Sequence, residues 1–287
     1  MRLLIAFLLV VGIPTAVRAQ TKFERSGPLD PDGAFRLHTL GGYVKVTGWD
    51  RDSVLVRGVV SAGLKPMAGG GRAGWKMSLY EGSVDAKAYA QLEIFVPRGA
   101  QVWIKGTSAT ITATGLTGSV DLNTIEGRIE AEGSPRELRV ETMRGDVVVK
   151  GSPRWVRLKS GDGSIAFSGE AEDAVLTTVD GAITSTSRLA RGRIETVEGT
   201  VTVSGPVPAG AVLDVDSHGG AVTLQLDPPV SATFSVFTVS GRIVNGIGKS
   251  SPKKAPGTGA ELAFMVGNGN ARVTVRTFSA PISLLGR

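Results

Sequence analysis

The 287-residue sequence has no cysteine and only two histidines, His38 and His218. The missing cysteines exclude a disulfide framework, a thiolate metal site and acylation as a lipoprotein. The histidines lie too far apart in the chain to build a zinc site, and no Ser-His-Asp arrangement can be assembled around either. We therefore assign no catalytic, cofactor-binding or metal-ligating residue, and we expect a protein that is not an enzyme and carries no cofactor.

Long helical patterns and nucleic-acid-binding features are also missing. After residue 19, apolar residues nowhere follow a helical period, and aromatic residues make up only 6% of the chain. Basic residues raise the pI to about 9.7 but are not gathered into an aromatic-lined groove, so we expect no nucleic-acid partner. What is present is 39 glycines with abundant Val, Thr and Ser, a composition typical of an all-β exported protein.

The first 19 residues predict a signal peptide. Arg2 precedes an apolar run over residues 3–13, and Val17-Arg18-Ala19 is a cleavage pattern before Gln20. The run is too short to span a bilayer, so the alternative, an uncleaved anchor, is the weaker interpretation. Cleavage removes two arginines and lowers the formal net charge from +6 to +4. We expect a periplasmic or extracellular protein with no transmembrane span after cleavage, stabilised by core burial in place of disulfides.

A repeat of 18 residues dominates the sequence from residue 120 to 205. Glycine recurs at a fixed step, as in stacked repeat architectures, at Gly127, Gly145, Gly163, Gly181 and Gly199. Each unit has the pattern apolar-x-apolar-x-Thr/Ser, two turn residues, then Gly-x-apolar-x-apolar. Alternation with period 2 on both sides of a tight turn predicts two half-buried strands per unit. The hydroxyl column consists of Thr124, Thr142, Ser160, Thr178 and Thr196.

The same register continues beyond the regular repeat. It fits residues 35–46 and 102–111 upstream, and 213–224, 234–243 and 273–284 downstream. The sequence therefore predicts one all-β domain over residues 20–287, a single-stranded β-solenoid (β-helix-like) of about ten rungs with a core period of 18. Its first rung is 35–48 and its regular rungs are 102–248.

Two segments interrupt the predicted rungs. Residues 49–101 contain further strand patterns and a glycine-rich loop, and we predict that they form an N-terminal cap over the exposed edge of the stack. Residues 249–258 form a basic, proline-containing loop that we expect to be flexible. Residues 259–287 then predict a capping hairpin and the last rung, with the hairpin turn at Gly267-Asn268-Gly269-Asn270.

Alanine replaces glycine twice in the glycine column, at Ala109 and Ala280. A column that required positive φ would penalise alanine. We infer that the column needs a small side chain, where the chain folds tightly against the hydroxyl column. Positive φ at all the glycines and both alanines would contradict this inference.

These features together resemble a known family. The matching stretches are Gly41-Gly42-Tyr43-Val44-Lys45-Val46, Ile94-Phe95-Val96-Pro97-Arg98-Gly99, the 18-residue units and the turn at Gly267–Asn270. They resemble the putative-adhesin, domain-of-unknown-function family of exported bacterial β-strand-repeat proteins, over nearly the whole chain after the leader. The resemblance implies an extracytoplasmic β-solenoid with no established activity and no catalytic residues to transfer.

Outward-facing charged columns are the first candidate surface. Stacking places Asp121 beside Arg139 and Glu141 beside Lys159, which predicts a solvated ladder of cross-strand pairs. The alternative is a polyanion-binding face that would use four cations of these columns, Arg139, Arg157, Lys159 and Arg193.

Acidic residues before the glycines are the second candidate. They form a column that Arg144 interrupts, consisting of Glu126, Asp162, Asp180 and Glu198. Ordinary turn chemistry accounts for acidic residues before glycine. The alternatives are that Asp162 and Asp180 bind calcium, or that they act as the acid and base of a carbohydrate-active β-helix.

A third candidate is an apolar column two residues before each glycine. It contains Ile125, Met143, Gly161, Val179, Val197, His218 and Val239. We favour a core position for these residues, tucked into the corner of the turn. If they are instead exposed, they form an apolar stripe of the kind that marks interaction surfaces.

The function that these patterns favour is a non-catalytic, extracytoplasmic binding, adhesin-like or envelope-structural protein. An envelope glycan, a polymer or a protein are the partner classes that suit repeated weak contacts along a rigid stack. The alternatives are a carbohydrate-active lyase or hydrolase using the turn carboxylates, and a passive envelope or signalling accessory. The ligand and the oligomeric state stay open.

Overall fold

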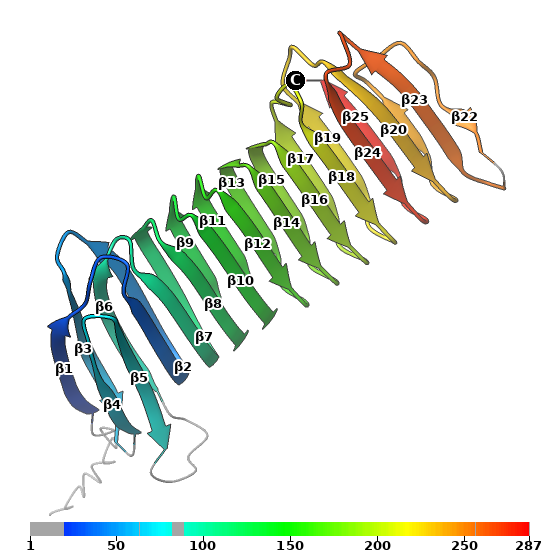
Figure 1. The fold of residues 1–287 in the computed structure, drawn as a ribbon. Coiled ribbons are helices and arrows are strands. Elements are labelled where there is room, and N and C mark those ends of the chain that lie inside the picture. The colour runs from blue at the N-terminus through cyan, green and yellow to red at the C-terminus, as the bar shows by residue number, and fades with distance from the viewer. Residues whose placement is uncertain (1–19, 63, 82–88, 256, 287) are drawn as a thin grey trace, which may run out of the picture.

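The computed structural model describes residues 20–62, 64–81, 89–255 and 257–286, and all regular elements in them are β-strands. The prediction of an all-β protein is confirmed. The described residues form 25 strands joined into one hydrogen-bonded sheet, which extends along a single direction (Figure 1). They contain no helix long and apolar enough to cross a membrane. The predicted signal peptide, residues 1–19, lies outside the described residues.

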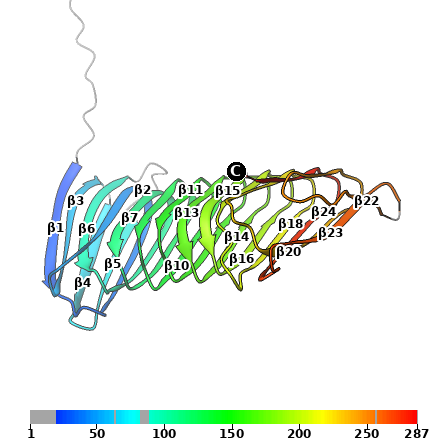
Figure 2. The same ribbon diagram turned by 90° about the horizontal axis from the view of Figure 1, so that it is seen from above.

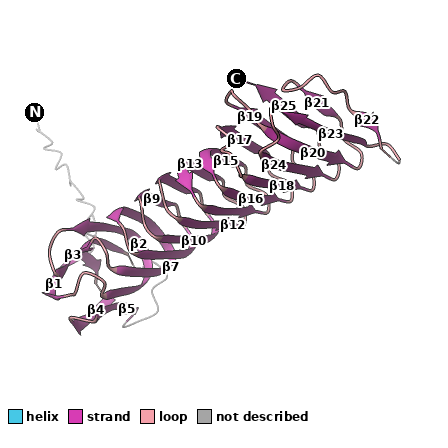
Figure 3. Ribbon diagram, turned by 45° about the horizontal axis from the view of Figure 1, so that its top comes forward, coloured by secondary structure: helices cyan, strands magenta, loops and turns pink. Residues whose placement is uncertain are grey.

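Two rows of parallel strands, here called row A and row B, make up the middle of the molecule (Figures 2 and 3). Row A contains β8 (Ser119–Glu126), β10 (Glu137–Arg144), β12 (Trp155–Ser160), β14 (Asp173–Thr178), β16 (Arg191–Thr196) and β18 (Val212–Ser217). Row B contains β9 (Ile129–Gly133), β11 (Val147–Gly151), β13 (Ile165–Ala171), β15 (Ile183–Leu189), β17 (Val201–Gly205) and β19 (Val222–Leu226). The chain alternates between the rows, so each strand pairs with the strand after next. In β12, for example, Leu158 pairs with Val140, 18 positions earlier.

Two long strands continue both rows toward the N-terminal end. β7 (Gln101–Leu116) pairs with β8 through its first part and with β9 through its second part. β2 (Ala34–Trp49) pairs with β7 along most of its length. On its other side, β2 pairs with β5 (Gly74–Glu81) in row A and with β6 (Ala90–Pro97) in row B. All these pairings are parallel.

Antiparallel strands close the N-terminal end. β4 (Leu64–Gly71) pairs with β5, and β3 (Ser53–Ser61) pairs with β6. β1 (Gln20–Pro28) then pairs with β3. The segment 49–101 thus supplies both a parallel pair that continues the rows and an antiparallel layer outside them.

The order of strands at the C-terminal end differs from their order in the chain. β24 (Ala271–Thr277) pairs in parallel with both β18 and β20 (Ala232–Thr238). β25 (Ile282–Gly286) pairs likewise with both β19 and β21 (Ile243–Asn245). The last described segment of the chain therefore lies between two segments that precede it.

The predicted hairpin across Gly267–Asn270 is wrong. β23 (Ala260–Val266) pairs antiparallel with β20, and β24 pairs with the opposite edge of β20, so β23 and β24 are not neighbours. The two-residue strand β22 (Lys253–Lys254), within the basic segment 249–258, lies outside β23. A Gly-Asn turn is a local signal, whereas in its observed place β24 buries Val273 and Val275 between two parallel partners.

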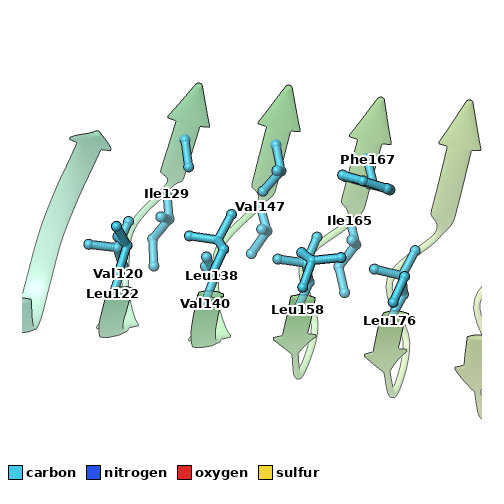
Figure 4. Packing of buried hydrophobic residues seen from close by; sticks show 14 of the residues in the cluster. Val120, Leu122, Ile129, Leu138, Val140, Val147, Leu158, Ile165, Phe167 and Leu176 are labelled. Carbon is cyan, nitrogen blue, oxygen red and sulfur yellow. The ribbon is translucent and has the colours of Figure 1, made fainter. Parts of the chain in front are cut away.

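Apolar columns fill the space between the two rows (Figure 4). Leu122, Val140 and Leu158 project from row A, and Ile129, Val147 and Ile165 project from row B, all of them buried. Full burial of each such side chain stabilises the fold by about 1.5–3 kcal/mol. Because apolar packing fills this interior, candidate functional residues are sought in the outward columns, the turns and the ends.

The glycine column requires small side chains, as inferred. Gly127 has a φ of 122°, but Gly145, Gly163 and Gly181 are not among the positive-φ residues, and no described non-glycine residue has positive φ. A Cβ atom on Gly181 would lie 1.9 Å from the carbonyl oxygen of Gly163, one repeat earlier. The hydroxyl column lies close by, since the Gly181 backbone N–H donates a hydrogen bond to Thr178 Oγ1 at 3.2 Å.

Candidate functional site

The outward charges of row A form a ladder of ion pairs. Lys159 Nζ lies 3.2 Å from Glu141 Oε1, as predicted, and Arg193 lies 2.6 Å from Glu195. Arg139 lies opposite Asp121 in the register but makes its ion pair with Glu137, at 3.4 Å.

The polyanion-binding alternative is weakened by this pairing. Of its four cations, Arg139, Lys159 and Arg193 each have a carboxylate partner, and only Arg157 forms no ion pair with another described residue. Paired charges of both signs favour the interpretation as a solvated ladder.

The turn carboxylates occupy exposed turns. The backbone N–H of Asp162 donates to the Met143 carbonyl at 3.0 Å, and that of Asp180 donates to the Gly161 carbonyl at 3.1 Å. Glu126 forms an ion pair with Arg144, the residue that interrupts the column. In the described part of the chain, no three His, Asp or Glu residues come together as a metal site. These contacts fit turn chemistry, and they add no further ligand to Asp162 and Asp180.

The apolar column is exposed, so the favoured core interpretation is wrong. Ile125, Met143, Val179 and Val197 are 48%, 56%, 48% and 43% exposed, whereas Ile129 and Ile165 are 0% and 1% exposed. The hydroxyl and glycine columns fill the inside of the turn, and the two residues between them, an apolar one followed by a turn residue, are left outside. An apolar stripe therefore follows the turns.

Phe278 belongs to the same stripe and was missed from the sequence. It is 50% exposed and stacks on His218, with ring centroids 4.7 Å apart. Phe278 precedes Ala280, a member of the glycine column, by two residues. The spacing that defines the apolar column could therefore have found it. Because β24 lies between β18 and β20, Phe278 lies between His218 and Val239 along the stripe.

A groove of about 650 Å³ crosses the outward face of row A near its N-terminal end. This volume is within the usual range for sites that bind small ligands. Strands β2, β5, β7, β8 and β10 carry its lining, which includes Arg36, His38, Lys76, Trp103, Asp121 and Arg139.

Five of these residues are successive register partners on adjacent strands. Lys76 is paired with Arg36, and Arg36 with Trp103. Trp103 is paired with Asp121, and Asp121 with Arg139. Because neighbouring strands lie about 4.8 Å apart, these side chains form a continuous line across the groove.

Trp103 gives the groove an apolar centre. Its ring packs against His38 in an edge-to-face contact, with centroids 4.6 Å apart and an interplanar angle of 74°. Edge-to-face contacts between rings fix their orientation. His38 is thus a neighbour of this tryptophan.

Charge is distributed unevenly along the line. At one end, Arg36 and Lys76 are both exposed, and neither forms an ion pair within the described ranges. At the other end, Arg139 pairs with Glu137, and half-buried Asp121 accepts a hydrogen bond from Asn123. Burial raises the pKa of Asp121, and the Asn123 hydrogen bond and the Arg139 charge only partly oppose that shift.

Part of this groove could have been found in the sequence. Arg36 and Trp103 lie six residues before Gly42 and Ala109, the same position that Asp121 and Arg139 hold before later glycines. Lys76 could not be found this way, because β5 lies in a segment where the repeat is interrupted.

No protein-family model matches the chain, and no curated protein matches its sequence. Solved structures resemble it at low identity. A putative adhesin from Bacteroides fragilis is 10% identical, with 92% of this chain and 97% of that chain covered and a TM-score of 0.44. A putative lipid binding protein from Parabacteroides distasonis is 11% identical, with 92% and 96% covered and a TM-score of 0.45. A putative adhesin from Parabacteroides merdae is 10% identical over the same shares, with a TM-score of 0.40. With TM-scores below 0.5, these likenesses assign neither a ligand nor a reaction to this chain.

Proposed function

We propose that this protein is an exported, non-catalytic binding protein built as a β-solenoid of about ten rungs with a period of 18 residues, and that the groove around Trp103 is its ligand site. The observation that carries the proposal is the groove itself, where an aromatic ring lies among hydrogen-bonding and charged side chains. A few directed polar groups around an apolar surface are typical of ligand sites.

The register supports the solenoid architecture. Parallel pairs in both rows join residues 18 positions apart, as Val140 and Leu158 do in row A and Val147 and Ile165 do in row B. We interpret the antiparallel strands β1, β3 and β4, and β22 and β23, as caps that cover the strand edges at the two ends. A capped, rigid stack holds the groove lining in place, since its residues come from five strands of one sheet.

Removing the aromatic centre of the groove tests the proposal. We expect the mature protein to bind isolated cell envelopes in a saturable way, and Trp103→Ala to reduce that binding at least about tenfold, because aromatic anchors carry much of the energy of a binding site. Trp155→Ala is the matched control, since Trp155 is 42% exposed on β12 and lies outside the groove lining. Equal binding by Trp103→Ala and the wild type would refute the site.

The carbohydrate-active alternative requires a separate assay. Polysaccharide cleavage is measured with and without calcium, for the wild type and for the double variant Asp162→Asn/Asp180→Asn. We expect no turnover in any arm. Calcium-dependent cleavage that the double variant loses would replace the binding function with catalysis at the turns.

A further inference from the structure

We propose that the groove binds an acidic saccharide, with a sugar ring on Trp103 and the carboxylate of that ligand between Arg36 and Lys76. This inference rests on the proposed function, because it names the ligand class of the same groove. Three observations carry it: two neighbouring cations without partners, an aromatic ring beside them, and carboxylates at the opposite end of the groove.

The two cations are neighbours in the strand register. Arg36 on β2 and Lys76 on β5 are register partners on adjacent strands, about 4.8 Å apart. Like charges placed opposite each other destabilise a sheet. Neither cation has an ion-pair partner in the part of the chain that the structure describes. An anionic group bound between them would relieve this repulsion and accept charge-assisted hydrogen bonds from both.

Three of the four cations considered earlier on row A are paired in the described structure, and Arg157 is the exception among them. Arg139, Lys159 and Arg193 each lie within 4 Å of a carboxylate, at 3.4, 3.2 and 2.6 Å. Lys105, the register partner of His38, is a further exposed cation beside the groove with no ion pair among the described residues. Arg36, Lys76 and Lys105 thus form one group of cations without ion pairs to described residues at the end where the groove begins.

Trp103 follows Arg36 in the line and offers a surface on which a sugar ring can pack. A pyranose presents several C–H groups on one face, and these pack on the electron-rich face of an aromatic ring. Asp121, the next residue in the line, offers carboxyl oxygens to sugar hydroxyls. The groove therefore combines an apolar platform with hydrogen-bonding groups, as a ring with many hydroxyls requires.

The carboxylates at the far end decide against a polyanion. Asp121 and Glu137 line the groove on the side away from Lys76. Arg139 at this end is already paired with Glu137. A ligand with negative charges along its whole length would be repelled by Asp121, whereas the neutral part of a ligand with one acidic sugar can donate hydrogen bonds to that carboxyl group. The charge distribution thus also orients the ligand, with its carboxylate over β5 and β2 and its neutral sugars toward β8 and β10.

A matched set of three saccharides tests the ligand class. Cellobiouronic acid, its carboxyl methyl ester and cellobiose differ only at one position, and each is titrated calorimetrically into the mature protein at neutral pH. We expect the acid to bind about tenfold more tightly than the ester or cellobiose, as the loss of charge-assisted hydrogen bonds implies. Arg36→Gln/Lys76→Gln removes that difference, and Arg36→Lys/Lys76→Arg retains it. Trp103→Ala weakens binding of all three, and Trp155→Ala binds as the wild type.

Four outcomes would overturn the inference. They are equal affinity for acid and ester, an unchanged preference in Arg36→Gln/Lys76→Gln, displacement of the acid by inorganic phosphate at equal concentration, and binding to phosphatidylglycerol vesicles in place of the saccharides. Any of these leaves the proposed function standing if Trp103→Ala still reduces envelope binding as expected above. If Trp103→Ala binds envelopes as well as the wild type does, the proposed function is refuted, whatever the saccharide titrations show. Thermal unfolding of each variant identifies any that fails to fold.

Discussion

The inward and outward columns of the same strands differ in how much they vary along the molecule. Some inward columns vary little, as Leu122, Val140 and Leu158 do in row A, because each of these side chains is fully buried between the rows. Outward positions at the same register change from Arg36 through Trp103 and Asp121 to Arg139. The difference teaches that the inward columns maintain the scaffold, while the binding proposed for the groove rests on a few outward positions.

The largest expected effect is on the inward side. Ile183→Ala removes a fully buried side chain and should lower the free energy of unfolding by about 2–5 kcal/mol. Val179→Ala, in the exposed stripe four residues earlier, should change it by no more than about 0.5 kcal/mol. Denaturant unfolding measures both. Similar losses for the two variants would end the distinction between core and stripe.

A smaller effect is expected in the glycine column. Gly181→Ala places a Cβ atom 1.9 Å from the Gly163 carbonyl oxygen, so the backbone of one repeat must shift. We expect destabilisation of about 1–3 kcal/mol, comparable to overpacking a core. Gly210→Ala controls for the loss of a glycine elsewhere, since nothing lies within 4 Å of its Cβ direction, although its φ of 77° adds strain. A neutral Gly181→Ala would contradict the close-approach explanation.

Two hydroxyl groups of the same column should contribute differently to the free energy of unfolding. Thr178 Oγ1 accepts a hydrogen bond from the Gly181 N–H at 3.2 Å and donates to the Gly161 carbonyl at 3.1 Å. Thr142 Oγ1 is buried without a hydrogen-bond partner in the described structure. Thr178→Val should therefore cost about 1 kcal/mol, and Thr142→Val should be neutral or stabilising. Chemical unfolding of the two variants measures this difference. Equal losses of unfolding free energy in Thr178→Val and Thr142→Val would contradict the prediction.

Two outward carboxyls should respond to pH with opposite sign. Burial raises the pKa of Asp121, so its ionisation opposes folding at neutral pH, and that penalty disappears as the pH falls through its folded-state pKa. Hydrogen bonds from the Ser164 hydroxyl and backbone N–H lower the pKa of Asp146. Its contribution to stability is present above the unfolded-state pKa and is lost as the pH falls through the folded-state value.

Unfolding measured from neutral to acidic pH checks these signs. Asp121→Asn should be at least as stable as the wild type at neutral pH, and Asp146→Asn less stable, with both differences shrinking in acid. A stable Asp146→Asn or a destabilised Asp121→Asn at neutral pH would reverse the assignment.

The smallest effect concerns the groove cations. Arg36→Gln/Lys76→Gln removes a like-charge contact and should raise the free energy of unfolding by a few tenths of a kcal/mol. Lys159→Gln breaks an ion pair with Glu141 and should lower it by about 0.5 kcal/mol or less. Added salt should reduce both changes. A loss of stability in Arg36→Gln/Lys76→Gln would mean that the two cations serve the fold.

The repeat predicted much of the fold because inward positions obey a strict rule. Alternation, the hydroxyl column and the glycine column place the buried positions of β8 to β17, and the same pattern with a longer connector fits β18 and β19. The C-terminal strand order could not be predicted, since the segment containing Val273 and Val275 matches any position in the rows equally well. The strands that this segment pairs with depend on the path of the chain through residues 246–270. The repeat pattern does not predict that path.

The candidate site was predicted only in part, for a different physical reason. Asp121 and Arg139 were found because they belong to the regular units, but Lys76 comes from an interrupted segment, and only the register of β5 on β2 brings it beside Arg36. The exposure of Ile125 and Met143 depends on how the turn is filled. The alternation of inward and outward side chains breaks down at a turn, so it does not predict whether such residues are buried or exposed.

The position of β24 and β25 between segments that precede them affects the order of assembly. During chain growth β20 and β21 are complete before β24 and β25 exist, yet in the described structure β20 and β21 pair with neither β18 nor β19, and β24 and β25 lie between them. The stack can therefore form strand by strand only as far as β19. From there the end must stay open until residues 271–286 arrive, and meanwhile β18 and β20 each present an unpaired edge to other chains.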